Sequence, residues 1–489
     1  MATMAEKMAA SLEELRKLQE KDRCVVLQGT AEIGRTHLTR LLDNGWLQEV
    51  MKGWYIAARP GTEGDTTVWY TSFWYFIAKY AAVRLGERWC LTADQSLDLY
   101  SGKTTVPVQV VIKSPKGHNN TQKLMYDTSL LVFQSEIPDQ VYKEPEYGLN
   151  LYPLAEALVY TTPRYFQVER IDILKVLTKN GASLRAGRIA GAFRNIGNSE
   201  IADSIVSTMR GFGYDVREED PFEDQPRTPL VYEVSPYVTR LRLMWENMRD
   251  KVVELFPEAP GKIDDVEGYL RSVDEKYSED AYHSLSIEGY RVSPELIEKV
   301  RVGNWKPEEE DKEHKNALVA RGYYQAFQAV RGTIADILKG KNAGEAVRAD
   351  HPVWYMQMWM PFVTVGILQR EDLVGYRTGQ VYIRGSQHIP LNPKVVRDAM
   401  PVLFDLLKNE PHPAVRAVLG HFFFVYIHPY MDGNGRMGRF VLNAMLASGG
   451  YNWTVVPVER RKEYMKALEK ASVEGDISEF TKVIASLVK

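Results

Sequence analysis

The chain has 489 residues and a formal net charge of only −3, so no whole-molecule field points to nucleic acid or a membrane as its partner. This length exceeds one ordinary core, and typical domain sizes predict about three folding units. Cys24 and Cys90 are the only cysteines, which excludes a disulfide framework or a cysteine-rich zinc module and fits a reducing cytoplasm.

Residues 1–60 predict a winged-helix-like domain. Charged residues run through the start, where an export signal needs an apolar stretch, so we expect a cytoplasmic protein with a leading helix. Residues 36–42 have helical periodicity, and Asn44-Gly45 is typical of a helix end. The runs 46–50 and 53–57 then predict two short strands that form a wing.

Residues 61–220 mix helices with strand-like runs such as 108–112 and 129–133. The segment GRTHLTRLLDNGWLQEVMKGWYIAARP, followed by this mixed region, resembles the AbiEi family of antitoxins over roughly the first 220 residues. The apolar stretches 69–83 and 353–368 fall short of a roughly 20-residue membrane span, so we interpret both as core helices.

A domain boundary is expected at residues 218–229, where acidic residues alternate with prolines that cannot continue a helix. A basic helical stretch, 164–210, precedes it. Helical periodicity follows over 239–256 and 264–287, and the second of these carries an apolar stripe. The predicted parts are 1–60, a mixed α/β region 61–220, a linker and helix 221–262, and a mainly helical domain 263–489.

The most informative segment is the loop that begins at His428. The helix before it, residues 414–427, ends in apolar residues, and Pro429 terminates it. Gly433 and Gly435 permit backbone conformations in which successive N–H groups turn towards one point, as in an anion-binding nest. These features place a histidine beside a concave turn.

Charged side chains surround this turn. Arg436 and Arg439 are three residues apart on the next helix, whose N-terminus adds positive potential, so both suit phosphate oxygens. Asp432 is a lone carboxylate beside such a site, which is how proteins usually hold magnesium. His428 would be the proton acceptor near neutral pH. The pattern predicts phosphoryl or nucleotidyl transfer.

The loop sequence HPYMDGNGRMGR resembles the signature of the Fic family, His-Pro-Phe-x-(Asp/Glu)-Gly-Asn-Gly-Arg-x-x-Arg. Tyr430 replaces the usual phenylalanine and keeps an aromatic ring. The resemblance covers roughly residues 260–489. It implies a fold that is mainly α with a small β part: an all-helical Fic core with a β-hairpin flap, preceded here by the winged-helix-like α/β region.

The resemblance also implies roles for the loop residues. His428 would deprotonate a serine, threonine or tyrosine hydroxyl of a target protein, which would attack the α-phosphate of ATP. Asp432 would hold Mg²⁺, while Asn434 and the N–H groups of Gly433 and Gly435 would bind phosphate oxygens. Arg436 would stabilise the leaving pyrophosphate, and Arg439 would hold the γ-phosphate. The protein would then be an AMP-transferring enzyme.

A hairpin is expected over residues 380–390, at the position of the family's flap. In that reading Val381, Tyr382 and Ile383 would align the target backbone by strand addition. A plain surface hairpin would give the same sequence pattern.

Ser284 and Glu288 end the apolar-striped helix and are four residues apart, so they lie on one face. The segment SLSIEG resembles the family's inhibitory motif, Ser/Thr-x-x-x-Glu-Gly/Asn. The resemblance implies that Glu288 pairs with Arg439 and competes with the phosphates of ATP for the same guanidinium.

Other functions stay open at this point. The chain could be a winged-helix DNA-binding regulator or antitoxin-like protein in which Fic activity is secondary. Arg35, His37 and Arg40 would then contact DNA. Relatives of the Fic type also transfer phosphate, phosphocholine or other nucleotides. The expected partners are ATP and a protein target, without a membrane, and a homodimer stays open.

Overall fold

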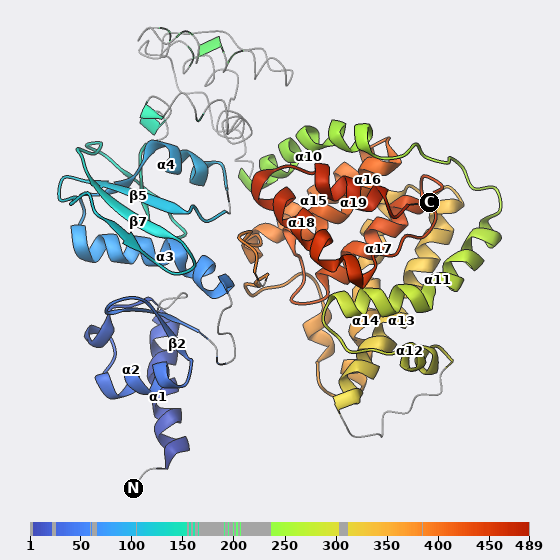
Figure 1. Cartoon of the computed structure of the whole chain (residues 1–489), viewed down its shortest axis with the longest axis horizontal. Helices are drawn as coiled ribbons and strands as arrows, with labels where there is room; N and C mark the ends of the chain where they lie inside the picture. Colours follow the sequence, from blue (N-terminus) through green and yellow to red (C-terminus); the bar gives the residue numbers. More distant parts are fainter. Residues whose placement is uncertain are drawn as a thin grey trace. The chain divides into compact units, whose positions relative to one another are not determined.

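The computed structural model forms two compact units, residues 1–236 with 382–389, and residues 237–381 with 390–489 (Figure 1). It describes residues 3–153 apart from 22–25, 59, 61–65 and 104, scattered residues between 156 and 206, and residues 236–302, 312–383 and 385–488. The basic stretch 164–210, but for a few scattered positions, and the expected boundary at 218–229 therefore lie outside the described residues.

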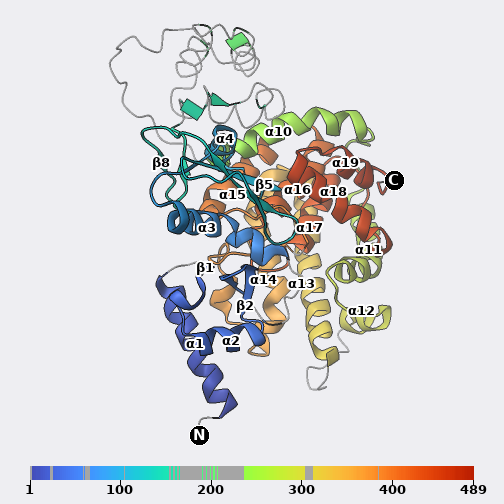
Figure 2. The same cartoon turned by 60° about the vertical axis from the view of Figure 1, so that its left-hand side comes forward.

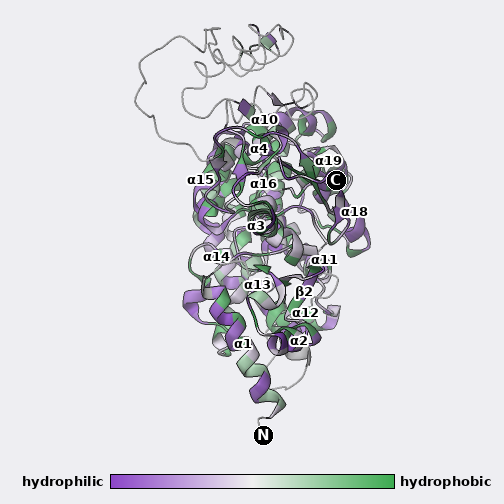
Figure 3. Cartoon of the chain, turned by 90° about the vertical axis from the view of Figure 1, so that its left-hand side faces the viewer, coloured by the Kyte–Doolittle hydropathy of each residue, from purple (hydrophilic) through white to green (hydrophobic). Residues whose placement is uncertain are grey.

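The first unit begins with two helices and a three-stranded antiparallel sheet in the order β1-β3-β2. The elements are α1 (Met4–Lys21), β1 (Val26–Leu27), the 3-10 turn η1 (Gly29–Ala31), α2 (Arg35–Asp43), β2 (Leu47–Met51) and β3 (Trp54–Ala57). Leu15 of α1 and Leu41 of α2 are buried in one cluster. Hydrophilic and hydrophobic residues alternate along α1 (Figure 3). The two predicted wing strands are confirmed.

The rest of this unit packs a long helix on a four-stranded sheet in the order β4-β5-β7-β6 (Figure 1). The elements are α3 (Thr66–Leu85), β4 (Cys90–Leu91), α4 (Ala93–Tyr100), β5 (Gln109–Ser114), β6 (Thr121–Lys123), β7 (Ser129–Gln134), β8 (Tyr142–Lys143) and β9 (Asn150–Leu151). Only the β5–β7 pairing is parallel among the described strands of this sheet. Alternate residues such as Val110 and Leu130 are buried against aromatic side chains of α3, which is a core helix as predicted.

The second unit is helical in its described residues. Its helices are α10 (Pro236–Leu255), α11 (Val266–Ile287), α12 (Pro294–Arg301), α13 (Lys312–Leu338), α14 (Ala343–Thr364), α15 (Pro393–Asn409), α16 (Pro413–Ile427), α17 (Asn434–Ala447), α18 (Arg461–Glu474) and α19 (Ser478–Ala485), with the 3-10 turns η2 (Arg370–Leu373) and η3 (Val458–Arg460). The periodicity over 239–256 and 264–287 therefore predicted α10 and α11 to within a few residues. The fold is mainly α with a small β part.

Helix α16 forms the centre of this unit, because almost every one of its side chains is buried. It packs along α17 and against α15, while α18 and α19 pair near the C-terminus (Figure 2). Helices α13 and α14 approach closely at Gly322, where an added Cβ would lie 1.8 Å from a backbone oxygen of α14. Among the described helices, none is long and apolar enough to span a bilayer.

The prediction of a β-hairpin over residues 380–390 is wrong, because the described residues of this segment form no strand. A turn does form, with Ser386 N donating to the carbonyl of Ile383 at 3.2 Å. Pro390 has no N–H for a ladder, and Gln380 reaches its carbonyl through the side-chain amide at 3.3 Å instead. Strand-like composition was therefore not enough to make a paired flap.

Candidate functional site

The predicted loop joins α16 to α17, two helices that lie side by side (Figure 1). His428 caps α16 in the left-handed region, with φ of 55° and ψ of 62°. Such a conformation is strained for a residue other than glycine, so the surrounding structure must hold it. Gly433 has φ of 87° and directly precedes α17, where the left-handed turn suits a glycine.

The ring of His428 is oriented by the end of its own helix. Its Nδ1 lies 3.1 Å from the carbonyl of Val425, an acceptor only, so Nδ1 carries the proton and Nε2 is the basic nitrogen. Burial lowers the pKa of His428 to about 4, and the positive charge of Arg377 acts in the same direction. The imidazole is therefore neutral near pH 7 and able to accept a proton at Nε2.

Asn434 closes the loop upon itself. Its Oδ1 accepts from Tyr430 N at 2.9 Å, and its Nδ2 donates to the Tyr430 carbonyl at 2.8 Å. The Tyr430 ring stacks on Tyr355 of α14 at 3.7 Å between centroids, which confirms a packing role for this aromatic position. Both amide atoms of Asn434 are thus used within the loop, and a phosphate contact by this side chain stays a prediction.

Asp432 is the most accessible charged group of the loop, with a side chain 63% exposed. Its Oδ1 accepts from Gly433 N at 2.5 Å and lies 3.5 Å from Arg436 Nη2. As a single accessible carboxylate, Asp432 would contribute one protein ligand to a metal ion. That arrangement suits magnesium, which keeps several waters and shares phosphate oxygens.

Arg436 is almost fully buried, at 1% exposure, between the rings of Trp359 and Tyr290 at 5.0 and 5.3 Å. Its Nε and Nη2 have no hydrogen-bond partner in the described part of the chain, and the same holds for Trp359 Nε1 and Arg439 Nη1. Arg436 Nη2 and Trp359 Nε1 both lie about 3.5 Å from the position of a Cβ on Gly433. Unpaired buried donors are costly, so this cluster favours an anion with several acceptor oxygens.

Ser284 and Glu288 both contact the other arginine of the loop. Arg439 Nε donates to Ser284 Oγ at 2.8 Å, and Arg439 Nη2 donates to the Ser284 carbonyl at 3.0 Å and to Glu288 Oε1 at 2.8 Å. Burial would raise the pKa of Glu288, but the charges of Arg439 and Arg436 outweigh it and hold that pKa below its usual range. The carboxylate stays ionised and paired at neutral pH.

Glu288 also lies directly on the loop. A Cβ added to Gly435 would lie 2.3 Å from Glu288 Oε1 and 3.3 Å from Arg439 Nη1. Only a glycine at this position leaves room for the carboxylate. The negative charge of Glu288 therefore occupies the space between Gly435 and the Arg439 guanidinium.

The sequence did not predict two of the side chains at this site. Trp359 lies in α14 within an apolar stretch that we interpreted only as core. Arg377 donates from Nε to the carbonyl of His428 at 2.7 Å and from its backbone N to the carbonyl of Pro429 at 2.9 Å. Neither residue has a local sequence signal, because each reaches the loop through tertiary packing.

The flap candidates differ in exposure. Val381 is buried, Tyr382 is 46% exposed and the Ile383 carbonyl accepts the turn hydrogen bond from Ser386. Their role in target binding stays a prediction.

The candidate DNA-contacting residues are partly used inside the first unit. Arg40 donates to Ser11 Oγ at 2.6 Å and to the Lys7 carbonyl at 2.7 Å, and His37 Nδ1 lies 3.0 Å from the same Ser11 hydroxyl. Arg35 is exposed. Two of the three side chains thus fasten α2 to α1.

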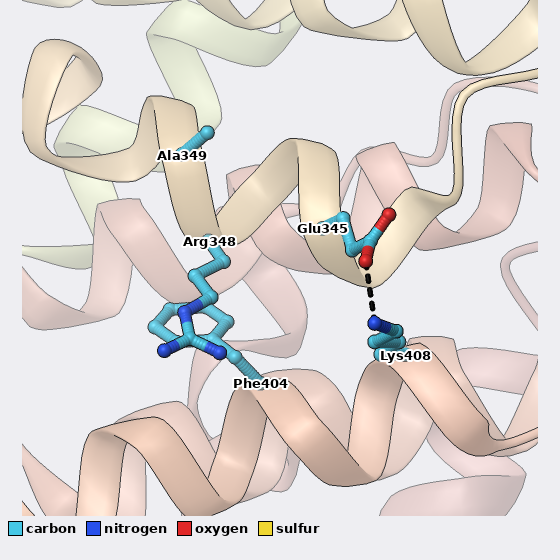
Figure 4. A pocket seen from close by; sticks show the side chains of 5 residues that line it. All are labelled: Glu345, Arg348, Ala349, Phe404 and Lys408. Carbon is cyan, nitrogen blue, oxygen red and sulfur yellow. Dashed lines mark ion pairs between the residues drawn. The ribbon is translucent and has the colours of Figure 1, made fainter.

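A separate hollow of about 500 Å³ lies between α14 and α15 and contains none of the predicted site residues. Figure 4 shows Glu345 and Lys408 pointing towards each other across it, where they form an ion pair at 2.6 Å. Arg348, Ala349 and Phe404 complete its lining. Its lining includes three charged side chains, Glu345, Arg348 and Lys408.

The Fic/DOC family model matches residues 364–446, which include α15, α16, the loop and most of α17. The chain carries a Fic domain. "Protein adenylyltransferase Fic" of Nematostella vectensis is 28% identical over 251 residues, 48% of this chain and 55% of that relative. The protein of the same name from Drosophila willistoni is 29% identical over 225 residues, 44% of this chain and 41% of its own length. The chain thus spans about half the length of the curated relatives it matches.

Among solved structures, "Fic-1 (aa134 - 508) from C. elegans" aligns with 68% of this chain and 92% of its own, at 19% identity and a TM-score of 0.37. That likeness is too low to carry an argument. The family match covers Arg377 as well as the loop of the Fic domain, but Ser284 and Glu288 lie before it. Their pairing with Arg439 therefore stands on its own geometry. The AbiEi-like reading of the N-terminal region stays a prediction.

Proposed function

We propose that the chain transfers AMP from ATP to a serine, threonine or tyrosine hydroxyl of a target protein, and that Glu288 restrains this activity. The main support is the set of unpaired guanidinium and indole donors from Arg436, Arg439 and Trp359 beside a neutral histidine. The names of the relatives, protein adenylyltransferase, agree with this chemistry.

In the proposed reaction His428 Nε2 accepts the proton of the target hydroxyl. The hydroxyl oxygen forms a bond to the α-phosphorus of ATP, the bond from that phosphorus to the bridging oxygen breaks, and pyrophosphate leaves. Arg436 and Arg439 would hold phosphate oxygens. The backbone N–H groups of Gly435 and, once released from Asp432 Oδ1, of Gly433 would be further donors. Positioning and charge neutralisation supply most of the rate in such transfers.

Asp432 is the residue that would hold Mg²⁺, because its carboxylate is accessible and lies next to the phosphate-binding donors. The ion would neutralise charge on the phosphates when bound. Asn434 would keep the loop in shape through its two hydrogen bonds to Tyr430.

The test uses the full chain with Glu288→Gly, ATP and magnesium, and a lysate as the source of targets. Label from ATP carrying a marked α-phosphate should enter protein, and label from the γ-phosphate should not. Mass spectrometry should find one adenylate on a hydroxyl residue. The added substitution His428→Ala should abolish both signals. Transfer of the γ-label, or adenylate that persists without His428, would show that the reaction is a different one.

The DNA-binding alternative is less favoured, because Arg40 and His37 hydrogen-bond to α1 through Ser11. A gel shift with the full chain, repeated at rising salt, tests it. Binding that falls steeply with salt would support a phosphate-contacting surface in the N-terminal unit.

A further inference from the structure

Arg377 is a buried arginine whose hydrogen-bond acceptors are main-chain carbonyls. It is 4% exposed, and burial lowers the pKa of its guanidinium to about 10. Nε donates to the His428 carbonyl at 2.7 Å, Nη1 donates to the Gly379 carbonyl at 3.0 Å, and Nη2 donates to the Leu391 carbonyl. A guanidinium buried among neutral acceptors is costly, so the position of these carbonyls must matter to the fold or to the site.

Arg377 holds the strained part of the loop. The His428 carbonyl receives the Arg377 side chain, and the next carbonyl, that of Pro429, receives the Arg377 backbone N–H at 2.9 Å. Two consecutive peptide planes are thereby fixed, and the left-handed φ of His428 lies just before them. Because the peptide planes set the direction of the Cα–Cβ bond, they also set where the imidazole points.

The same side chain also binds the carbonyls of Gly379 and Leu391. These two residues flank the predicted flap, and each gives its carbonyl to one arm of the guanidinium. The fork geometry of arginine makes three such bonds at once, which a lysine ammonium cannot reproduce in one plane. The histidine and these two residues thus share one anchor.

We propose that Arg377 is a positioning residue that fixes the orientation of His428 relative to Gly379 and Leu391. The proposal rests on the proposed function, because it assigns Arg377 to the reaction in which His428 accepts a proton. Its charge provides a second signature. Arg377 is one of three charged groups that act on the His428 ring, and its charge lowers the His428 pKa while Glu288 and Asp432 raise it.

Helix α16 supplies a matched control at its other end. Arg416 is also partly buried, and it donates from Nη1 to the carbonyls of Glu410 and Pro411 at 2.7 and 3.0 Å. Its Nη2 donates to Ser448 Oγ at 2.9 Å. Arg416→Met therefore removes a similar number of arginine hydrogen bonds, at the N-terminal end of α16, and leaves the loop at its C-terminal end unchanged.

The experiment compares Arg377→Met, Arg377→Lys and Arg416→Met in the Glu288→Gly chain. We expect Arg377→Met to lower kcat for AMP transfer by about 100-fold, with KM for ATP changed by no more than about twofold, because a small misplacement of a reacting group has effects of that size. Arg377→Lys keeps the charge but loses the fork, so kcat should stay low. Arg416→Met should leave kcat unchanged.

NMR of histidine-labelled protein gives a readout that does not depend on activity. The His428 signal is assigned by its loss in His428→Ala. Its pKa should rise in Arg377→Met, return to the parent value in Arg377→Lys and stay unchanged in Arg416→Met. If Arg377→Met fails to fold, Arg377→Lys alone tests the proposal, because it should show an unchanged His428 pKa together with a low kcat.

An unaltered His428 pKa and kcat in folded Arg377→Met would overturn the proposal, as would an equal loss of kcat in Arg416→Met. If no variant transfers AMP, the proposed function has failed, while the NMR titration still decides whether Arg377 sets the state of the His428 ring.

Discussion

Removal of the Glu288 charge should lower the thermal stability of the protein and raise its affinity for ATP. The substitution Glu288→Gln keeps the size of the side chain and removes its charge. Arg439, with a side chain only 4% exposed, then keeps its bonds to Ser284 but loses an ionised partner at 2.8 Å. The perturbation therefore removes one hydrogen-bonded ion pair of the loop, that between Glu288 and Arg439.

The size of the effect follows from burial. The Glu288 side chain is 26% exposed, so the pair is neither a surface salt bridge nor a fully buried one. A charge-assisted hydrogen bond of this kind contributes about 2 kcal/mol. In the proposed competition ATP displaces Glu288 from Arg439, so the same 2 kcal/mol should tighten ATP binding by about 30-fold.

Two measurements with opposite signs check this reasoning. Calorimetry in a His428→Ala background should give a lower Kd for ATP in Glu288→Gln than in the parent. Thermal unfolding without ATP should show a lower Tm for the variant, and ATP should raise that Tm more than it raises the parent's. Glu298→Gln is the control, because Glu298 pairs with Arg301 on the surface of α12, where both side chains are nearly half exposed. Equal ATP affinity in Glu288→Gln and the parent would refute the competition between Glu288 and phosphate.

Two further predictions concern stability. Gly322→Ala should lower the free energy of unfolding of the helical unit by about 3 kcal/mol, because the added Cβ would lie 1.8 Å from a backbone oxygen of α14. Gly332→Ala in the same helix is the control: its Cβ would meet open space, so the variant should be as stable as the parent or more stable. Urea unfolding measures both. Burial lowers the pKa of His351 to about 4 and that of His421 to about 3, so the unfolded chain binds more protons below an ordinary histidine pKa near 6.5. The free energy of unfolding should therefore fall as pH drops from about 6.5 to about 4, by about 2 kcal/mol for each histidine at about pH 5, and a flat urea midpoint over this range would contradict that linkage.

The sequence predicted the parts of the site whose geometry is local. Helix termination by Pro429, the left-handed Gly433 and the four-residue spacing of Ser284 and Glu288 all depend on neighbours within a turn or two. Arg377 could not be found in this way, because it meets a carbonyl 51 positions along the chain.

The hairpin prediction failed for a related reason. Residues 380–383 have strand-like composition, but a strand needs a partner that can donate and accept along a ladder. Pro390 has no backbone N–H to donate, and the side-chain amide of Gln380, rather than a backbone N–H, donates to the Pro390 carbonyl. Composition reports the preference of a segment, whereas pairing depends on the backbone opposite it.

The loop of the Fic domain is held at its two ends by different contacts, and this separation has a consequence for control. Arg377 acts at His428, where the proton would be accepted, while Glu288 acts at Arg439, where phosphate would bind. Substitution of Glu288 should therefore change ATP affinity, and substitution of Arg377 should change kcat. Because the two contacts share no hydrogen-bond partner, their effects on ATP affinity should add within about 0.5 kcal/mol in the double variant Arg377→Met/Glu288→Gln. A large departure from additivity in calorimetry would mean that the loop moves as one body, and the brake would then work by displacing the histidine rather than by occupying the phosphate site.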